Sequence, residues 1–228
     1  MSVNHNEIKH DVVTENQALL DLVKNFARKF FKNSRVSHRW DHTLRVFLLC
    51  QRIGPQEGAD MTVLLAAAYL HDIGRARQDS LNGAICHARE GARIAHSFIY
   101  ELPLSQIQKE NILHCIETHR FRGNRQPETE EAKILFDADK LDAIGAIGIA
   151  RAYLFAGEIG ARLHASEGNS DDSNSYSEND TGYREYRVKL RKIKDRMLTA
   201  EGRRLAEGRH AFMENFFERF IQEHEGKG

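Results

Sequence analysis

A run of ten almost wholly apolar residues, Met61–Leu70, leads directly into the sequence His71-Asp72-Ile73-Gly74. Such a run is too short to span a bilayer, which needs about 20 apolar residues, and it fits a helix buried in a globular core. Gly74 is expected to stop that helix, because a residue without a Cβ tolerates the left-handed conformation that often follows a last turn. An imidazole and a carboxylate are therefore expected at the end of a rigid core helix.

Two interpretations of this His-Asp pair are open when it is considered alone. In the first, the histidine caps helix carbonyls and the aspartate is solvated, so that both are structural. In the second, the pair belongs to a functional site. A single short motif does not separate these interpretations, and the rest of the chain has to decide between them.

The balance of charge limits the partners that this chain can have. It contains 33 basic and 33 acidic residues, with a formal net charge of zero. This balance argues against polymeric nucleic acid or a membrane as the main partner. The three cysteines have no CxxC spacing, so neither a disulfide framework nor a thiolate zinc site is predicted. The N-terminus lacks the apolar segment of a signal peptide, so we expect a cytoplasmic protein. We also expect a monomer or a homodimer.

Apolar residues recur at helical spacing along most of the chain and predict an all-α protein with a single compact domain and an extra C-terminal helical pair. We expect a flexible leader over 1–13 and a domain over 14–224, with its core at about 38–151. The stretch 164–182 has five acidic residues and no lysine or arginine, and it predicts a flexible acidic loop. The C-terminal helices are expected over 183–224, beginning with one long amphipathic helix that ends near residue 198.

Further residues of the metal-ligand type lie on other predicted helices. His42 lies on the second of them, and Asp137 and Asp139 lie close together on a later one. A site with His42, His71, Asp72 and one of these aspartates offers two imidazole nitrogens and two carboxylates. This mixed set suits Mn²⁺, Fe²⁺ or Mg²⁺, and also accommodates zinc. Without thiolates, and with positions left for water, it indicates a catalytic rather than a structural metal.

The chain resembles the HD-domain metal-dependent phosphohydrolases, whose pattern H…HD…D is met by His42, His71-Asp72 and Asp139. The similarity is to the branch of small, single-domain bacterial and archaeal HD hydrolases, and it covers about residues 20–220. It is carried by the segments SHRWDHTLRV (37–46), LAAAYLHDIGR (65–75), HAREGARIA (87–95), CIETHRFRG (115–123), EAKILFDADKLDAIGAIGIAR (131–151) and TAEGRRLAEGRHAFM (199–213). The resemblance implies an HD-domain helical fold and favours Asp139 over Asp137 as the fourth ligand.

The resemblance also implies an activity. The expected protein is a divalent-metal-dependent phosphohydrolase that cleaves a phosphate ester or anhydride of a small nucleotide with a metal-activated water. One divalent cation is expected, first Mn²⁺ or Mg²⁺, with Fe²⁺, Ni²⁺ and Zn²⁺ as alternatives. His87 and His119 fall where two-metal members of the superfamily place extra ligands, and their alternative roles are to bind substrate phosphate or to cap helices. The rival functions are a cyclic-nucleotide phosphodiesterase, an alarmone hydrolase and a nucleotide- or metal-binding regulatory module.

Cations that neutralise charge on phosphoryl oxygens are expected around such a site. Asp72, Lys140 and Arg75 are the candidate catalytic residues, with Asp72 as both ligand and proton acceptor. The candidate phosphate-binding residues come from the loop after His119 and from the C-terminal helices: Arg120, Arg122, Lys189, Arg204 and Arg209. For the C-terminal members of this set, a solvated basic face is the alternative.

Overall fold

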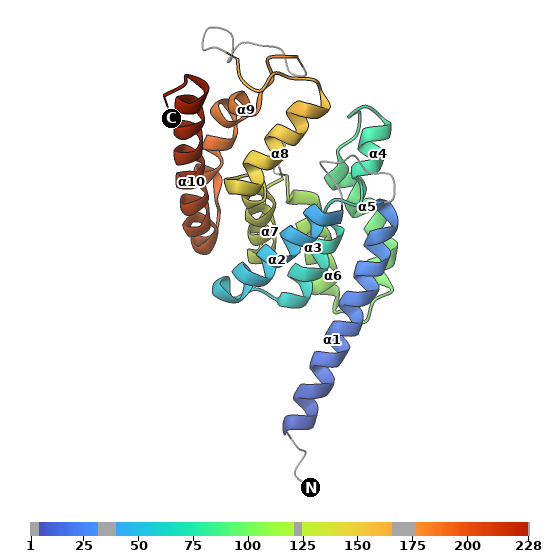
Figure 1. Cartoon of the computed structure of the whole chain (residues 1–228). Helices are drawn as coiled ribbons and strands as arrows, with labels where there is room; N and C mark the ends of the chain where they lie inside the picture. Colours follow the sequence, from blue (N-terminus) through green and yellow to red (C-terminus); the bar gives the residue numbers. More distant parts are fainter. Residues whose placement is uncertain (1–4, 32–39, 121–124, 166–176, 228) are drawn as a thin grey trace. The chain divides into compact units, whose positions relative to one another are not determined.

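The computed structural model describes residues 5–31, 40–120, 125–165 and 177–227. All regular secondary structure in these ranges is helical, which confirms the all-α prediction (Figure 1). The chain divides into two compact units, Met1–Phe136 and Asp137–Gly228. The boundary between them falls inside one helix, α7 (Glu130–Leu141). The described residues include no helix that has both the length and the apolar character needed to cross a membrane.

Helix α3 is the central element of the first unit (Figure 1). It packs against α1, α2 and α6, while α5 packs against α4 and α6. Eight of its ten residues are buried, which confirms the core helix predicted from the apolar run. The elements of this unit before α7 are α1 (His5–Arg28), η1 (Lys29–Phe31), α2 (Trp40–Glu57), α3 (Met61–Leu70), α4 (Arg75–Ser80), α5 (His87–Tyr100) and α6 (Gln106–Thr118).

Both ends of α3 are set by specific residues. At its start, the carboxylate of Asp60 accepts hydrogen bonds from the N–H groups of Thr62 and Val63. At its end, Gly74 has φ −83° and ψ −6°, so the expected left-handed stop is wrong. A Cβ at this position would lie 2.3 Å from the carbonyl oxygen of His87 and 2.6 Å from the nitrogen of Gly91. Glycine is therefore needed because the turn after α3 touches the backbone of α5.

Helix α1 begins at His5, within the segment 1–13 that was expected to be a flexible leader. The prediction differs from the structure for residues 5–13, which are helical. No glycine or proline interrupts the sequence from residue 5 to residue 28, so nothing in it ends the helix earlier.

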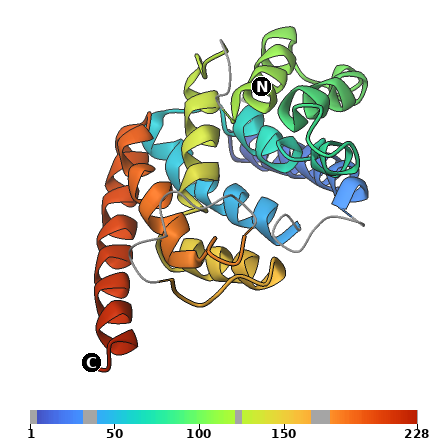
Figure 2. The same cartoon turned by 90° about the horizontal axis from the view of Figure 1, so that it is seen from above.

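The second unit is built from the end of α7 and the helices that follow it. In this unit α8 packs against both α9 and α10, as Figures 1 and 2 show. Its elements after α7 are α8 (Gly145–Glu158), α9 (Gly182–Val188), η4 (Leu190–Lys192), η5 (Lys194–Arg196) and α10 (Ala200–His224). The predicted acidic loop lies largely outside the described residues, because 166–176 are not among them.

The long helix expected from residue 183 to residue 198 is wrong, because α9 ends at Val188 and two 3₁₀ turns follow. The buried side chains of this stretch are Leu190, Ile193 and Met197. Their spacing of three and four residues is compatible with an α-helix and with a 3₁₀ helix of three residues per turn. The apolar pattern therefore could not distinguish the two.

Candidate metal centre

Asp72 lies in the turn after α3, and four histidines from separate elements surround its carboxylate. Each of these five residues is at most 3% exposed. The histidines are His42 on α2, His71 at the end of α3, His87 at the start of α5 and His119 at the end of α6. Buried ionisable groups are costly unless they are paired or bound to a cation. A bound cation would account for the burial of these ionisable side chains.

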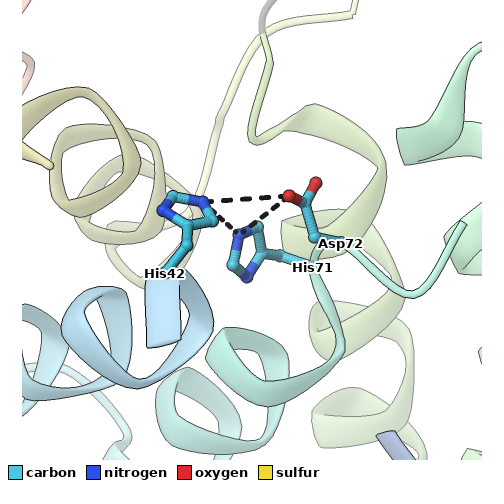
Figure 3. Close-up of side chains that lie close together, drawn as sticks. All are labelled: His42, His71 and Asp72. Atoms are coloured by element: carbon cyan, nitrogen blue, oxygen red, sulfur yellow. Dashed lines mark hydrogen bonds and ion pairs between the residues drawn. The ribbon is translucent and has the colours of Figure 1, made fainter. Parts of the chain in front are cut away.

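The first ligand group contains His42, His71 and Asp72, the residues of the sequence motif (Figure 3). The Nε2 atoms of the two histidines are 3.3 Å apart. Oδ2 of Asp72 lies 3.8 Å from Nε2 of His42 and 3.9 Å from Nε2 of His71. Figure 3 shows the two rings and the carboxylate turned toward one another from α2 and from the turn after α3.

The second ligand group contains Asp72, His87 and His119. Nε2 of His87 lies 3.1 Å from Oδ1 of Asp72 and 3.1 Å from Nε2 of His119. Nε2 of His119 lies 3.7 Å from the same carboxylate oxygen. One oxygen of Asp72 thus faces each group, and the carboxylate joins the two. This geometry favours the interpretation of His87 and His119 as ligands of a second ion.

His71 and His119 are held in the same way. Each is the residue that caps the C-terminus of its helix, α3 or α6. Nδ1 of His71 lies 2.8 Å from the carbonyl oxygen of Ala68, and Nδ1 of His119 lies 2.7 Å from that of Ile116. A carbonyl oxygen only accepts hydrogen bonds, so each Nδ1 donates one, and each Nε2 lies within 4 Å of an oxygen of Asp72.

The charges at the centre are fixed by its surroundings. Burial by itself would raise the pKa of Asp72. The Arg75 guanidinium, the neighbouring His71 and hydrogen bonds from His119 and His87 together outweigh burial and hold this pKa well below the usual range. Nη2 of Arg75 lies 3.1 Å and 3.4 Å from the two carboxylate oxygens. Burial lowers the pKa of His87 to about 3, although the Asp72 carboxylate opposes this shift. At neutral pH the centre therefore contains an ionised carboxylate next to a neutral imidazole.

A divalent cation fits this set of donors. Lone pairs of buried imidazoles and both oxygens of an ionised carboxylate meet where water is excluded, and a cation balances their negative potential. Imidazole together with carboxylate suits Mn²⁺, Fe²⁺ or Zn²⁺, and Mg²⁺ is also bound through carboxylates.

Among the described residues of the first unit, Arg75 and Arg120 contact the centre. Arg75 contacts Asp72, and within the described residues its Nε is buried without a hydrogen-bond partner. Nη1 of Arg120 lies 3.2 Å from Oε1 of Gln78 and 3.2 Å from Nδ1 of His87. The predicted phosphate ligand Arg122 lies outside the described residues.

The second unit distinguishes Asp137 from Asp139. The buried carboxylate of Asp137 accepts hydrogen bonds from the backbone N–H of Leu198, at 2.9 Å, and from the N–H and hydroxyl of Thr199, at 2.8 Å and 2.7 Å. Asp137 therefore joins α7 to the start of α10. Asp139 forms an ion pair with Lys140 at 2.5 Å. These contacts support Asp139 as the ligand of the pair, and that assignment stays a prediction.

The remaining candidate phosphate ligands contact groups of their own unit. Lys189 pairs with Glu185 on α9, and Arg204 pairs with Glu201 on α10. Nη1 of Arg209 donates to the carbonyl oxygen of Leu141. Their roles in phosphate binding, like those of Arg120 and Arg122, stay predictions.

Among the described residues, Gln78 contacts the centre through its side chain and was missed by sequence reasoning. Its Oε1 atom lies 3.0 Å from the backbone nitrogen of His87 and 2.7 Å from Nδ1 of the same residue. No local pattern marks Gln78, because the contact arises only when the short helix α4 folds against α5.

Comparison with known proteins agrees with this arrangement. The family model described as HD domain matches residues 39–144. The chain is 32% identical to the protein YpgQ of Bacillus subtilis over 202 residues, which cover 85% of this chain and 88% of that protein. Among solved structures, YpgQ in complex with ADP gives a TM-score of 0.71 at 26% identity, covering 91% of this chain and 96% of that one.

A second solved structure is an HD-superfamily hydrolase from Bacillus thuringiensis. It gives a TM-score of 0.73 at 27% identity and covers 92% of this chain and 98% of that one. The family match spans His42, His71, Asp72 and Asp139, the residues of the predicted H…HD…D pattern. The likeness to YpgQ extends over most of both chains, so this protein belongs to the HD-domain family.

Proposed function

We propose that this protein is a divalent-metal-dependent phosphohydrolase that cleaves a phosphate ester or anhydride of a small nucleotide. The observation that carries this proposal is the buried carboxylate of Asp72 with one histidine group on each of its oxygens. The neighbours in the HD superfamily described as hydrolases, and the complex of YpgQ with ADP, support it.

The cation would be held by His42, His71 and Asp72, with Asp139 as the expected fourth ligand and His87 and His119 as ligands of a second ion. Mn²⁺ or Mg²⁺ is the expected metal. A bound divalent cation lowers the pKa of its water and polarises a phosphoryl oxygen.

The protein's own residues have separate roles in this proposal. Arg75 orients the Asp72 carboxylate, and its remaining N–H groups offer hydrogen bonds to a phosphoryl oxygen. Lys140 and Arg120 are further cations for charge that develops on the phosphate. The depressed pKa of Asp72 favours the ligand role over the proton acceptor role, because a weakly basic carboxylate is a poor general base near neutral pH.

A cyclic-nucleotide phosphodiesterase is the second candidate, and the second ligand group favours it. Two metal ions about 3.5–4 Å apart can stabilise both the attacking and the leaving oxygen of a phosphodiester. Asp72 presents one oxygen to each ligand group, and these groups would hold the ions.

The proposal is tested by measuring phosphate and pyrophosphate release from a panel of substrates. The panel contains nucleoside mono-, di- and triphosphates, cyclic nucleotides and a guanosine 3′-diphosphate, each with Mn²⁺, with Mg²⁺ and with chelator. Chelator-sensitive release from the linear nucleotides supports the proposal, and the product shows which bond breaks. Turnover confined to cyclic nucleotides or the 3′-diphosphate supports the phosphodiesterase or the alarmone hydrolase instead. Metal binding without any turnover favours the regulatory module.

A further inference from the structure

Helix α10, at the C-terminal end of the chain in Figure 1, has one buried face and one exposed face. The buried residues recur at helical spacing: Gly202, Ala206, His210, Met213 and Phe217. On the opposite face, Phe212 and Phe216 are 49% and 36% exposed. The outer face of a helix that packs on one core is normally polar, and clustered apolar side chains there mark an interaction site. Two exposed rings about one turn apart therefore indicate a surface that another molecule covers.

Gly208 lies about one turn before Phe212 on the same exposed face. A glycine in the interior of a helix makes that helix less stable than an alanine would. No atom of the described residues lies within 4 Å of a Cβ at this position, so packing among them does not require a glycine. A second helix that packs closely against α10 would give Gly208 a reason to be small, because side chains of one helix insert into the grooves of the other.

The exposed face of α10 is complementary to itself when a second copy runs in the opposite direction. In a pair related by a two-fold axis, residues equally far before and after the axis face one another. Three pairs on this face have almost the same midpoint, near residues 210 and 211: Gly208 with Phe212, Leu205 with Phe216, and Arg204 with Glu218. The members of these pairs are about one, three and four turns apart, so both members of each pair lie on the same side of the helix. One axis therefore serves all three pairs and forms each of them twice.

The apolar contacts of this arrangement match in shape. The ring of Phe212 would fill the hollow at Gly208 of the second copy. Phe216 would cover Leu205, which is only half-buried in its own chain. Both rings would then leave water, which is the main favourable term in association.

The charges of this arrangement also match. Glu218 is exposed and forms no ion pair among the described residues. The side chain of Arg204 is 61% exposed beside Glu201 of its own chain, and it would lie opposite Glu218 of the second copy. A parallel pair would instead place Arg204 against Arg204. The charges therefore favour the antiparallel direction.

We propose that the exposed face of α10 is a homodimer interface, in which two copies of this helix pack antiparallel with Phe212 of one copy against Gly208 of the other. Aromatic and arginine side chains are enriched in such interfaces. The interface does not depend on the proposed function. For Arg204, it is an alternative to the predicted contact with a substrate phosphate.

The first measurement is sedimentation velocity over a series of protein concentrations, in which we expect the wild type to dimerise. Gly208→Leu fills the hollow with a residue that favours helix formation. It is expected to weaken dimerisation by at least about tenfold, as for the loss of a central contact of an interface. Far-UV circular dichroism should retain the helical signal.

Gly157 on α8 offers a matched control. It is exposed, and no atom of the described residues lies within 4 Å of a Cβ at that position either. Gly157→Leu is expected to leave dimerisation unchanged. The pair of variants separates the effect of filling the hollow on α10 from the effect of any larger side chain on an exposed helix.

Charge reversal tests the antiparallel direction. Arg204→Glu would place two carboxylates opposite each other in both symmetric contacts, and it is expected to weaken dimerisation by about threefold or more. Arg204→Glu combined with Glu218→Arg restores opposite charges between the copies and is expected to recover dimerisation.

A wild-type protein that stays monomeric over the whole concentration series would overturn the inference, and this result needs no variant to fold. Gly208→Leu protein that dimerises as tightly as Gly157→Leu protein would also overturn it, because the contact would lie elsewhere. A double charge variant that dimerises no better than Arg204→Glu alone would overturn the antiparallel arrangement.

Discussion

The two ligand groups share Asp72 but are built in different ways. His71 and Asp72 are neighbours in sequence, so the first group is largely assembled once the core helix α3 has formed. The second group needs α5 to approach the turn after α3, and this approach depends on Gly74. In this group Nδ1 of His87 also contacts the Gln78 side chain. The comparison teaches that a short motif can reveal one half of a centre while the other half depends on packing.

Loss of Asp72 is expected to have the largest effect, because it removes the carboxylate that both groups share. Asp72→Ala should reduce hydrolysis by more than about a hundredfold, an effect that loss of an outer partner of a metal ligand already reaches. Turnover of the best substrate is measured beside far-UV circular dichroism, which should keep its helical signal. Asp72→Ala protein that retains full activity would refute the shared-carboxylate model.

Substitutions of Asp139 and Asp137 test which of the two aspartates completes the first ligand group. Asp139→Asn is expected to weaken Mn²⁺ binding by roughly tenfold or more while stability changes little, as expected for a ligand. Asp137→Ala leaves buried donors of Leu198 and Thr199 without an acceptor and should lower the free energy of unfolding by about 1–3 kcal/mol. Calorimetry and urea unfolding measure the two effects. If Asp137→Ala weakened Mn²⁺ binding and Asp139→Asn lowered the stability, Asp137 would be the ligand instead.

Gly74→Ala is the substitution that should separate the two groups. Its Cβ would meet backbone atoms at 2.3 Å and 2.6 Å, so α5 has to move away from the turn after α3. We expect a loss of about 1–3 kcal/mol of stability from overpacking. Binding at the second group should weaken more than at the first, as measured by Mn²⁺ titration. Gly157→Ala is the control, because no atom of the described residues lies within 4 Å of a Cβ at that position. Equal losses of Mn²⁺ affinity at both ligand groups would contradict the expectation that Gly74 acts mainly on the second group.

The cysteines near the second group should show the smallest effect, a difference in reactivity. Burial opposes the thiolate of Cys86, but the N–H groups of Arg89 and Ala88 and the charge of Arg120 outweigh it and lower its pKa. Burial raises the pKa of Cys115. Since the thiolate is the reactive form, Cys86 should react with iodoacetamide at lower pH and faster than Cys115. Peptide mass spectrometry over a pH series measures both rates. Equal rates would contradict the difference in pKa between the two thiols.

The sequence was informative where local pattern and structure coincide. The apolar run predicted α3, and the pattern H…HD placed His42, His71 and Asp72 in one group. Residues that act through packing could not be predicted in this way. Gly74 was interpreted as a left-handed stop, whereas its small size is what matters.

The other differences between prediction and structure also have a physical cause. Gln78 carries no motif, because its contact with His87 joins two helices that are separated by a loop. The 3₁₀ turns after α9 bury side chains at intervals that an α-helix also allows. Sequence spacing could not separate Asp137 from Asp139, and only the family resemblance suggested Asp139 as the ligand.

The most direct test of the buried centre is a count of the divalent ions that it holds. Chelator-treated wild-type protein and Asp72→Ala protein are titrated side by side with Mn²⁺ in a calorimeter. We predict saturable binding in the wild type, with a second equivalent from His87 and His119, and loss of both equivalents in Asp72→Ala. Absence of Mn²⁺ binding in the wild type, or unchanged binding in Asp72→Ala, would contradict the shared metal centre.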